Sequence, residues 1–217
     1  MNKAKNIVVT ISRQQASGGA YIGHLLAKNL GFRYMEQEIL SLTAKELGVN
    51  LADLAHKEEC CDGFVEKMMK SFMYGTPEAG YAAPVRKPVL DEDLFLTESR
   101  IIKTIANSYD AVIVGRGGYS ILAGMRNAVH VFVHASLDFR VTRLQKYNRI
   151  STAQARAEIE ESDRRREKYL STMTKTNWCD ARNYHLCIDA EASGFDEAQR
   201  IIMDLVEKRK SDLEEEP

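Results

Sequence analysis

Four small residues near the N-terminus, SGGA at positions 17–20, have the composition of a phosphate-binding loop. They lie between an apolar run at residues 6–11 and a helical pattern at residues 20–30. Backbone N–H groups and the positive end of a helix dipole converge at such a junction, and small side chains let an anion approach them. A glycine pair between a strand and a helix is more often only a turn, so this assignment depends on the rest of the chain.

A second glycine turn, GRGG at residues 115–118, follows the apolar run at residues 111–114. Open α/β sheets bind ligands just beyond the carboxyl ends of their strands. The planar guanidinium of Arg116 is suited to pairing with a phosphate at that edge. The alternative is a tight turn that carries a solvated arginine.

Two charged helices are predicted at residues 137–148 and 153–172. The second contains Arg164 and Arg166, and Asp163 shares a helical face with Arg166 because the two are three residues apart. Such a run is usually a solvated helix face. A helix of this kind can also close arginines over phosphates that are being transferred.

The remaining pattern predicts an α/β protein whose short apolar strands form a parallel sheet covered by helices on both faces. Residues 12–19 are expected to form the loop, residues 50–88 an inserted subdomain or mobile flap, and residues 211–217 a frayed acidic tail. The other expected strands are residues 32–34, 129–133 and 185–188, and the other expected helices are residues 36–47, 94–107 and 195–210.

Composition limits the classes of partner. The chain has 217 residues, which favours one domain, and its formal net charge is -1. With that balance we expect no binding to nucleic acid or to an anionic membrane, so any anion site must be local. Its four cysteines form neither a CxxC pair nor a zinc pattern, which favours reduced thiols. The sequence shows no signal-peptide core, and we expect a cytoplasmic location.

Five segments, taken in order, resemble the cytidylate kinase-like family. They are ISRQ at residues 11–14, SGG at 17–19, VIVGRG at 112–117, DRRREKY at 163–169 and NYHL at 183–186. The resemblance covers nearly the whole chain. It implies a three-layer P-loop kinase-like domain over residues 1–217, with a substrate-side subdomain at about 36–90 and an arginine-bearing lid at about 150–172.

The resemblance also implies ATP and Mg²⁺, and it marks where this chain departs from related loops. The P-loop lysine that contacts the β- and γ-phosphates is replaced by Gly19 or Ala20, depending on the alignment. Arg13 is the nearest cation and could compensate from the front of the loop. The Ser or Thr hydroxyl that would hold Mg²⁺ just after the glycines is also missing. Ser12 and Ser17 are candidate substitutes for it, and the sequence does not establish which residues bind the metal.

Further roles come from matching positions. Cytidylate kinases have Gly-Arg-Asp where this chain has Gly117 in place of the aspartate. Glu36 is expected either to orient the acceptor or a metal-bound water, or to be a helix carboxylate stabilised by the dipole. Arg143 is expected to flank the nucleotide base. The alternative is that Arg140 and Arg143 are both ordinary cations on the helix surface. The expected catalytic residues are Arg13, Arg116, Arg164 and Arg166, and the expected phosphate-binding residues are Ser12, Arg13, Ser17, Gly18, Gly19, Ala20 and Arg143.

Three functional hypotheses remain open. The first is phosphoryl transfer from ATP to a small nucleotide, with CMP or dCMP as the acceptor. The second is a nucleotide- or phosphate-sensing module that has lost turnover, and the third is a kinase for a non-nucleotide acceptor. The sequence leaves the oligomeric state open, a homodimer included.

Overall fold

The structure is a computed structural model that describes residues 6–51, 54 and 90–215. The insertion expected at residues 50–88 lies almost entirely outside the described residues, as do the first five residues and the last two.

Five parallel strands form the sheet, in the order β2-β3-β1-β4-β5. The strands are β1 (Val8–Arg13), β2 (Arg33–Met35), β3 (Ala111–Val114), β4 (Ala128–His134) and β5 (Leu186–Asp189). β1 lies in the centre, and every residue of β1 and β3 is buried. Because both faces of these strands are covered, the residues of β3 are all apolar rather than alternating between apolar and polar. The predicted parallel α/β fold is confirmed.

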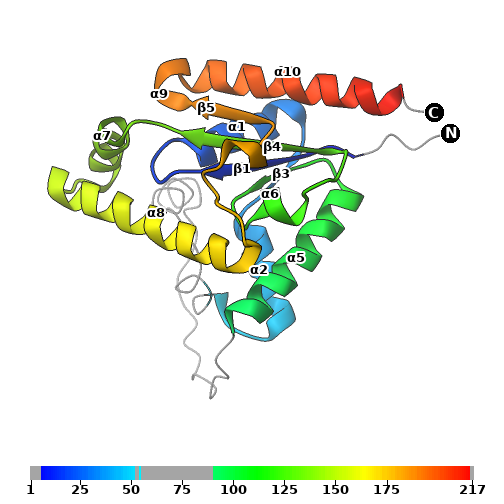
Figure 1. Cartoon of the computed structure of the whole chain (residues 1–217), viewed down its shortest axis with the longest axis horizontal. Coiled ribbons are helices and arrows are strands. Elements are labelled where there is room, and N and C mark those ends of the chain that lie inside the picture. Colours follow the sequence, from blue (N-terminus) through cyan, green and yellow to red (C-terminus); the bar gives the residue numbers. More distant parts are fainter. Residues whose placement is uncertain (1–5, 52–53, 55–89, 216–217) are drawn as a thin grey trace, which may run out of the picture.

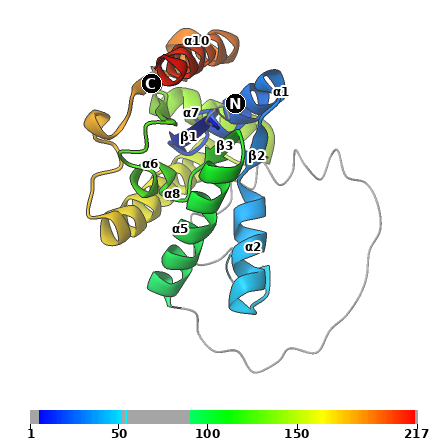
Figure 2. The same cartoon turned by 90° about the vertical axis from the view of Figure 1, so that its right-hand side faces the viewer.

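Helices cover both faces of the sheet and make three layers (Figure 1). Alternate residues of β1 point to opposite faces, so Val9 and Ile11 pack with α1 (Gly19–Leu30) and α10 (Phe195–Glu214). On the other face, Val8 packs with α2 (Gln37–Leu47) and α5 (Asp91–Ser108), next to the one-turn helix α6 (Gly118–Ile121). Figure 2 shows α2 and α5 side by side.

Two further helices lie where the central strands end. They are α7 (Leu137–Asn148) and α8 (Thr152–Thr174), and in Figure 1 the arrow of β4 points toward α7. Ser151 and Gln154 form a capping box that starts α8, each side chain accepting from the other residue's backbone N–H. The chain then returns through η1 (Ala181–Asn183), β5 and α9 (Ala190–Ser193) to α10.

Several predicted boundaries differ from those in the structure, and two of the differences have a clear physical reason. Residues 12 and 13 were expected in the loop, but β1 continues through them because Ser12 pairs with Phe132 and Arg13 with Val133 of the longer strand β4. The C-terminal segment was expected to fray from residue 211, but α10 continues to Glu214, and Leu213 is partly buried against the core.

Among the described residues, no helix has the length and apolar character needed to cross a membrane.

Candidate active site

The loop between β1 and α1 has the backbone conformation of an anion cradle. Gly18 is the N-cap of α1 with φ of +97°, and Ala16 has φ of +61°. The cap has no side-chain hydrogen bond, and the first N–H groups of a helix have no partner within it. A Cβ added to Gly18 would lie 2.4 Å from the ring of Phe195, so glycine is required by both conformation and space. The N–H groups of Gln14, Gln15 and Ser17 are bonded within the protein, so the amides that this segment can offer a ligand are those at the start of α1.

Arg13, the last residue of β1, directs its guanidinium toward the end of β2. Only 4% of Arg13 is exposed, and its Nη2 lies 3.1 Å from Oε1 of Glu36. The Tyr34 hydroxyl also donates a hydrogen bond to Glu36. Glu36 occupies the N-cap position of α2 without capping it, so its carboxylate is turned to Arg13 and Tyr34 instead of to the helix amides.

Arg116 lies beside this pair, at the end of the neighbouring strand β3. It has φ of +56° between two glycines that also have positive φ, a conformation that costs a residue with a Cβ roughly 1–2 kcal/mol. Its Nη1 is 3.5 Å from Oε1 of Glu98, a carboxylate on α5 with no exposed surface. Burial, and next the neighbouring Arg13 charge, lower the pKa of Arg116 to about 10, with a smaller contribution from Arg166. The guanidinium groups of Arg13 and Arg166 thus both lie within electrostatic range of Arg116.

α8 is joined to the loop through Asp163. One oxygen of its carboxylate accepts from the backbone N–H of Gln15 at 2.8 Å and from Nη1 of Arg166 at 3.2 Å. The other oxygen accepts from Nη1 of Arg140 at 2.6 Å. Arg166 is 1% exposed and Arg140 6% exposed, so Asp163 pairs with two buried cations while it holds the loop. The Ser162 hydroxyl adds a hydrogen bond to the Gln15 side chain at 3.1 Å.

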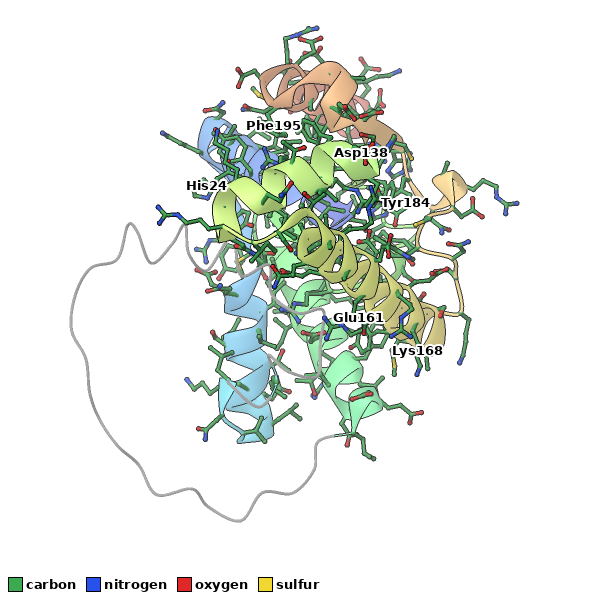
Figure 3. The ribbon with its side chains drawn as sticks, turned by 90° about the vertical axis from the view of Figure 1, so that its left-hand side faces the viewer. His24, Asp138, Glu161, Lys168, Tyr184 and Phe195 are labelled. Carbon is green, nitrogen blue, oxygen red and sulfur yellow. The ribbon has the colours of Figure 1, made fainter. Side chains whose placement is uncertain are left out.

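A small pocket lies on the other side of the loop, between the loop and α7. Arg143 donates from Nε to the Ala16 carbonyl at 3.1 Å, and its guanidinium carbon lies 4.5 Å from the centre of the Phe195 ring. Tyr21 and Tyr147 complete the lining beside the loop residues. In Figure 3, the labelled Phe195 lies beside α7, close to the start of α1. Arg143 is partly buried, and this burial lowers the pKa of its guanidinium.

The model of the cytidylate kinase-like family matches residues 8–192, which include both glycine turns and all of α8. The chain belongs to the cytidylate kinase-like family. Membership in this kinase-like family supports phosphoryl transfer as the general class of activity. A search of curated protein sequences gave no match.

Solved structures share the fold of this cytidylate kinase-like chain. An uncharacterized protein from Eubacterium ventriosum ATCC 27560 has a TM-score of 0.69 and 20% identity, covering 93% of this chain and 99% of its own. Shikimate kinase from Bacteroides thetaiotaomicron has a TM-score of 0.51 and 11% identity, covering 93% and 98%. A gluconokinase from Sinorhizobium meliloti 1021 has a TM-score of 0.50 and 14% identity, covering 95% and 97%. At these identities the likeness shows the fold alone.

The structure brings four of the predicted residues together and leaves one apart. Arg13, Glu36, Arg116 and Arg166 lie in one buried group at the carboxyl edge of the sheet. Arg164 does not join them, because its side chain is 69% exposed and pairs with Glu161 on the outer surface of α8. Glu161 and Lys168 mark this helix in Figure 3.

The two hydroxyls considered as substitutes for the missing Mg²⁺ hydroxyl are both buried. Ser17 donates to the carbonyls of Gln14 and Val133, and Ser12 lies within β1, near Tyr184. Within the described ranges, no three acidic, histidine or cysteine side chains are grouped so that they could hold a metal ion. Gly117, where cytidylate kinases have aspartate, has φ of +64°, and an added Cβ would lie 3.3 Å from Leu170 and from Phe95. Two neighbouring helices therefore close over the place where that aspartate would stand.

Sequence reasoning missed Glu98, the acid that balances Arg116. A signal was available, because Leu94, Glu98 and Ile102 are spaced at four residues and share the buried stripe of α5. A carboxylate inside an apolar stripe indicates a buried partner of opposite charge. The hydrogen bond between the Gln15 N–H group and Asp163 was also missed. No local sequence pattern predicts it, because 148 residues separate the two.

Proposed function

We propose that this protein transfers the γ-phosphoryl group of ATP to a small phosphorylated nucleotide of the CMP or dCMP kind. The observation that carries the proposal is the convergence of Arg13, Arg116 and Arg166, from three separate elements, beside the amide-lined loop. Phosphoryl transfer requires little covalent chemistry from the protein, so positioning and charge neutralisation dominate catalysis. Buried guanidinium groups beside backbone amides provide both.

The donor is assigned to the loop and to the pocket beside it. The phosphates would lie over residues 16–20, where the turn at Gly18 and the first amides of α1 favour an anion. Arg143 and Tyr147 line the pocket beside these residues and would contact the base. Mg²⁺ commonly binds through substrate phosphates and water with one or two carboxylates, so it needs no dedicated protein cage here.

The acceptor is assigned to the opposite side of the same edge. Arg116 would hold its phosphate through two parallel hydrogen bonds, and Glu36 would orient the acceptor or a metal-bound water. In the reaction, an acceptor phosphate oxygen bonds to the γ-phosphorus while the bond to the β–γ bridging oxygen breaks and ADP leaves. The subsidiary parts of this one domain are a substrate-side subdomain at about residues 36–90 and a lid at about 150–172.

The lid assignment is supported by the contacts of α8. Arg166 enters the buried group, and Asp163 ties the helix to the loop at Gln15. Closure of such an element excludes water and completes the charge environment of the transferred group. Arg164 lies on the far side of α8, so we assign it no contact with phosphate.

A second candidate function is nucleotide binding without turnover. The absence of Gly-Lys-Ser/Thr at the loop favours it, because groups aimed at developing charge commonly contribute several kcal/mol to catalysis. In that case the cradle and pocket would serve as a sensor site.

The test is to incubate the purified full-length protein with ATP, Mg²⁺ and a panel of nucleoside monophosphates, and to measure ADP. Shikimate and gluconate belong in the panel, because kinases of this fold are named for acting on them. We expect ADP formation that depends on a pyrimidine monophosphate. ATP binding without ADP formation would support the sensor, and ADP formation only with a non-nucleotide would transfer the proposal to that acceptor. If the protein neither binds ATP nor forms ADP, both proposed functions are overturned.

A further inference from the structure

The loop of this chain has a cation and a glycine in exchanged positions. The common P-loop pattern is Gly-x4-Gly-Lys-Ser/Thr, with the lysine at the start of the helix. α1 begins at Gly19 and is capped by Gly18, so Gly18 corresponds to the second glycine of the pattern and Gly19 to its lysine. Counting back five residues, Arg13 stands where the pattern has its first glycine. The charge absent from residue 19 is therefore present at residue 13.

The two positions are linked through the space that they share. A Cβ added to Gly19 would lie 2.5 Å from Cβ of Arg13 and 3.2 Å from its Cγ. Separations below about 3 Å are not tolerated between packed carbon atoms, since interiors have no free space to relieve them. The backbone thus has room for one side chain at this point, from residue 13 or from residue 19. An arginine at residue 13 requires a glycine at residue 19.

The exchange also changes the direction from which the cation arrives. A lysine at residue 19 would extend from the helix, whereas Arg13 extends from the end of β1. Its buried guanidinium pairs with Glu36 at the end of β2, and its charge lowers the pKa of Arg116. The cation therefore lies between the loop and the acceptor side.

We propose that Arg13 and Gly19 form a coupled exchange that moves the phosphate-contacting cation of the P-loop from the start of α1 to the end of β1. Arg13 then contacts the β- and γ-phosphates of the donor, which deepens the proposed function and rests on it. The sequence expectation that Arg13 compensates for the missing lysine thereby acquires a steric basis. Restoring the common pattern requires both substitutions together.

The experiment is a double-substitution cycle in the full chain, with Arg13→Gly, Gly19→Lys and the pair combined. Thermal unfolding measures the steric link, and Kd values for ATP and AMP in the presence of Mg²⁺ measure the phosphate contact. We expect Gly19→Lys alone to lower the melting temperature and the combined variant to recover it. Arg13→Gly should weaken ATP binding about 10- to 100-fold and leave AMP binding nearly unchanged, because a lost charge-assisted contact to the outer phosphates affects ATP alone.

Matched variants separate a phosphate contact from a structural role. Arg13→Lys keeps the charge and should retain most of the preference for ATP over AMP, whereas Arg200→Ala removes an exposed cation on α10 and should change neither value. An unchanged ratio of ATP to AMP affinity in Arg13→Gly, with ATP still bound, would overturn the phosphate contact alone. A combined variant as unstable as Gly19→Lys would overturn the steric exchange. Failure of the wild type to bind ATP would overturn the proposed function and the phosphate contact with it.

Discussion

The two glycine turns at the carboxyl edge of the sheet begin alike and end differently. Each leaves a central strand and enters a helix through residues with positive φ. The loop at residues 14–18 leads into the 12-residue helix α1, whereas the turn at residues 115–117 leads into α6, a single turn. The first can present the amides of a long helix to an anion, and the second presents one guanidinium. The same sequence signal, a glycine pair after a buried strand, therefore supports two different contributions to one site.

The neighbours of the two turns differ as well. α8 holds the first through charge, because Asp163 accepts from the Gln15 N–H group. It covers the second through apolar contact, since Leu170 lies 3.3 Å from where a Cβ of Gly117 would be. α8 thus contacts both turns, one through charge and the other through apolar packing, and each contact can be disrupted separately.

The largest effect is expected from Arg116→Ala. It removes the guanidinium that pairs with Glu98, a carboxylate with no exposed surface, which should cost about 3 kcal/mol or more of folding free energy. Adding Glu98→Gln should recover most of the stability without restoring acceptor binding. Urea unfolding and titration with CMP measure the two properties. Acceptor affinity that is unchanged in a folded Arg116 variant would refute the assignment of Arg116.

The two contacts of α8 should differ in their response to charge. Leu170→Ala should cost about 3 kcal/mol, because Leu170 is 2% exposed and packs against Trp178. Asp163→Asn should cost about 2 kcal/mol, since it leaves Arg140 and Arg166 without their shared carboxylate. We also expect Asp163→Asn, but not Leu170→Ala, to increase hydrogen exchange at the Gln15 amide. Equal exchange in both variants would show that the loop is not held by charge.

The smallest effect concerns the glycine of the first turn. Gly18→Ala and Gly124→Ala both place a Cβ on a residue with positive φ, at a cost of roughly 1–2 kcal/mol each. Only Gly18 has a close neighbour, Phe195, whereas the Cβ at Gly124 would meet no atom within 4 Å. Gly18→Ala should therefore be the less stable by about 1 kcal/mol in thermal unfolding. Identical losses would mean that Phe195 can move aside at no cost.

The sequence located the elements of the site more reliably than the partners of its side chains. The runs rich in apolar residues that form β1, β3 and β4 reflect a sheet covered on both faces. Such runs can be recognised from the sequence alone. The end of β1 was misplaced because residues 12 and 13 are polar. They are kept in the strand by pairing with β4, which lies about 120 residues further along the chain.

By itself, the sequence determined the parallel α/β architecture and predicted a phosphate loop with arginines near it, because glycine turns and buried strands have local signatures. Only the tertiary structure decided which arginines enter the site. Arg166 and Arg164 are two residues apart on one helix, yet one is buried beside Asp163 and the other is exposed beside Glu161. The tertiary structure also placed Gly19 so close to Arg13 that an added Cβ would lie 2.5 Å from the Arg13 Cβ. Both outcomes depend on how separate elements pack, and a pattern along the chain does not contain that information.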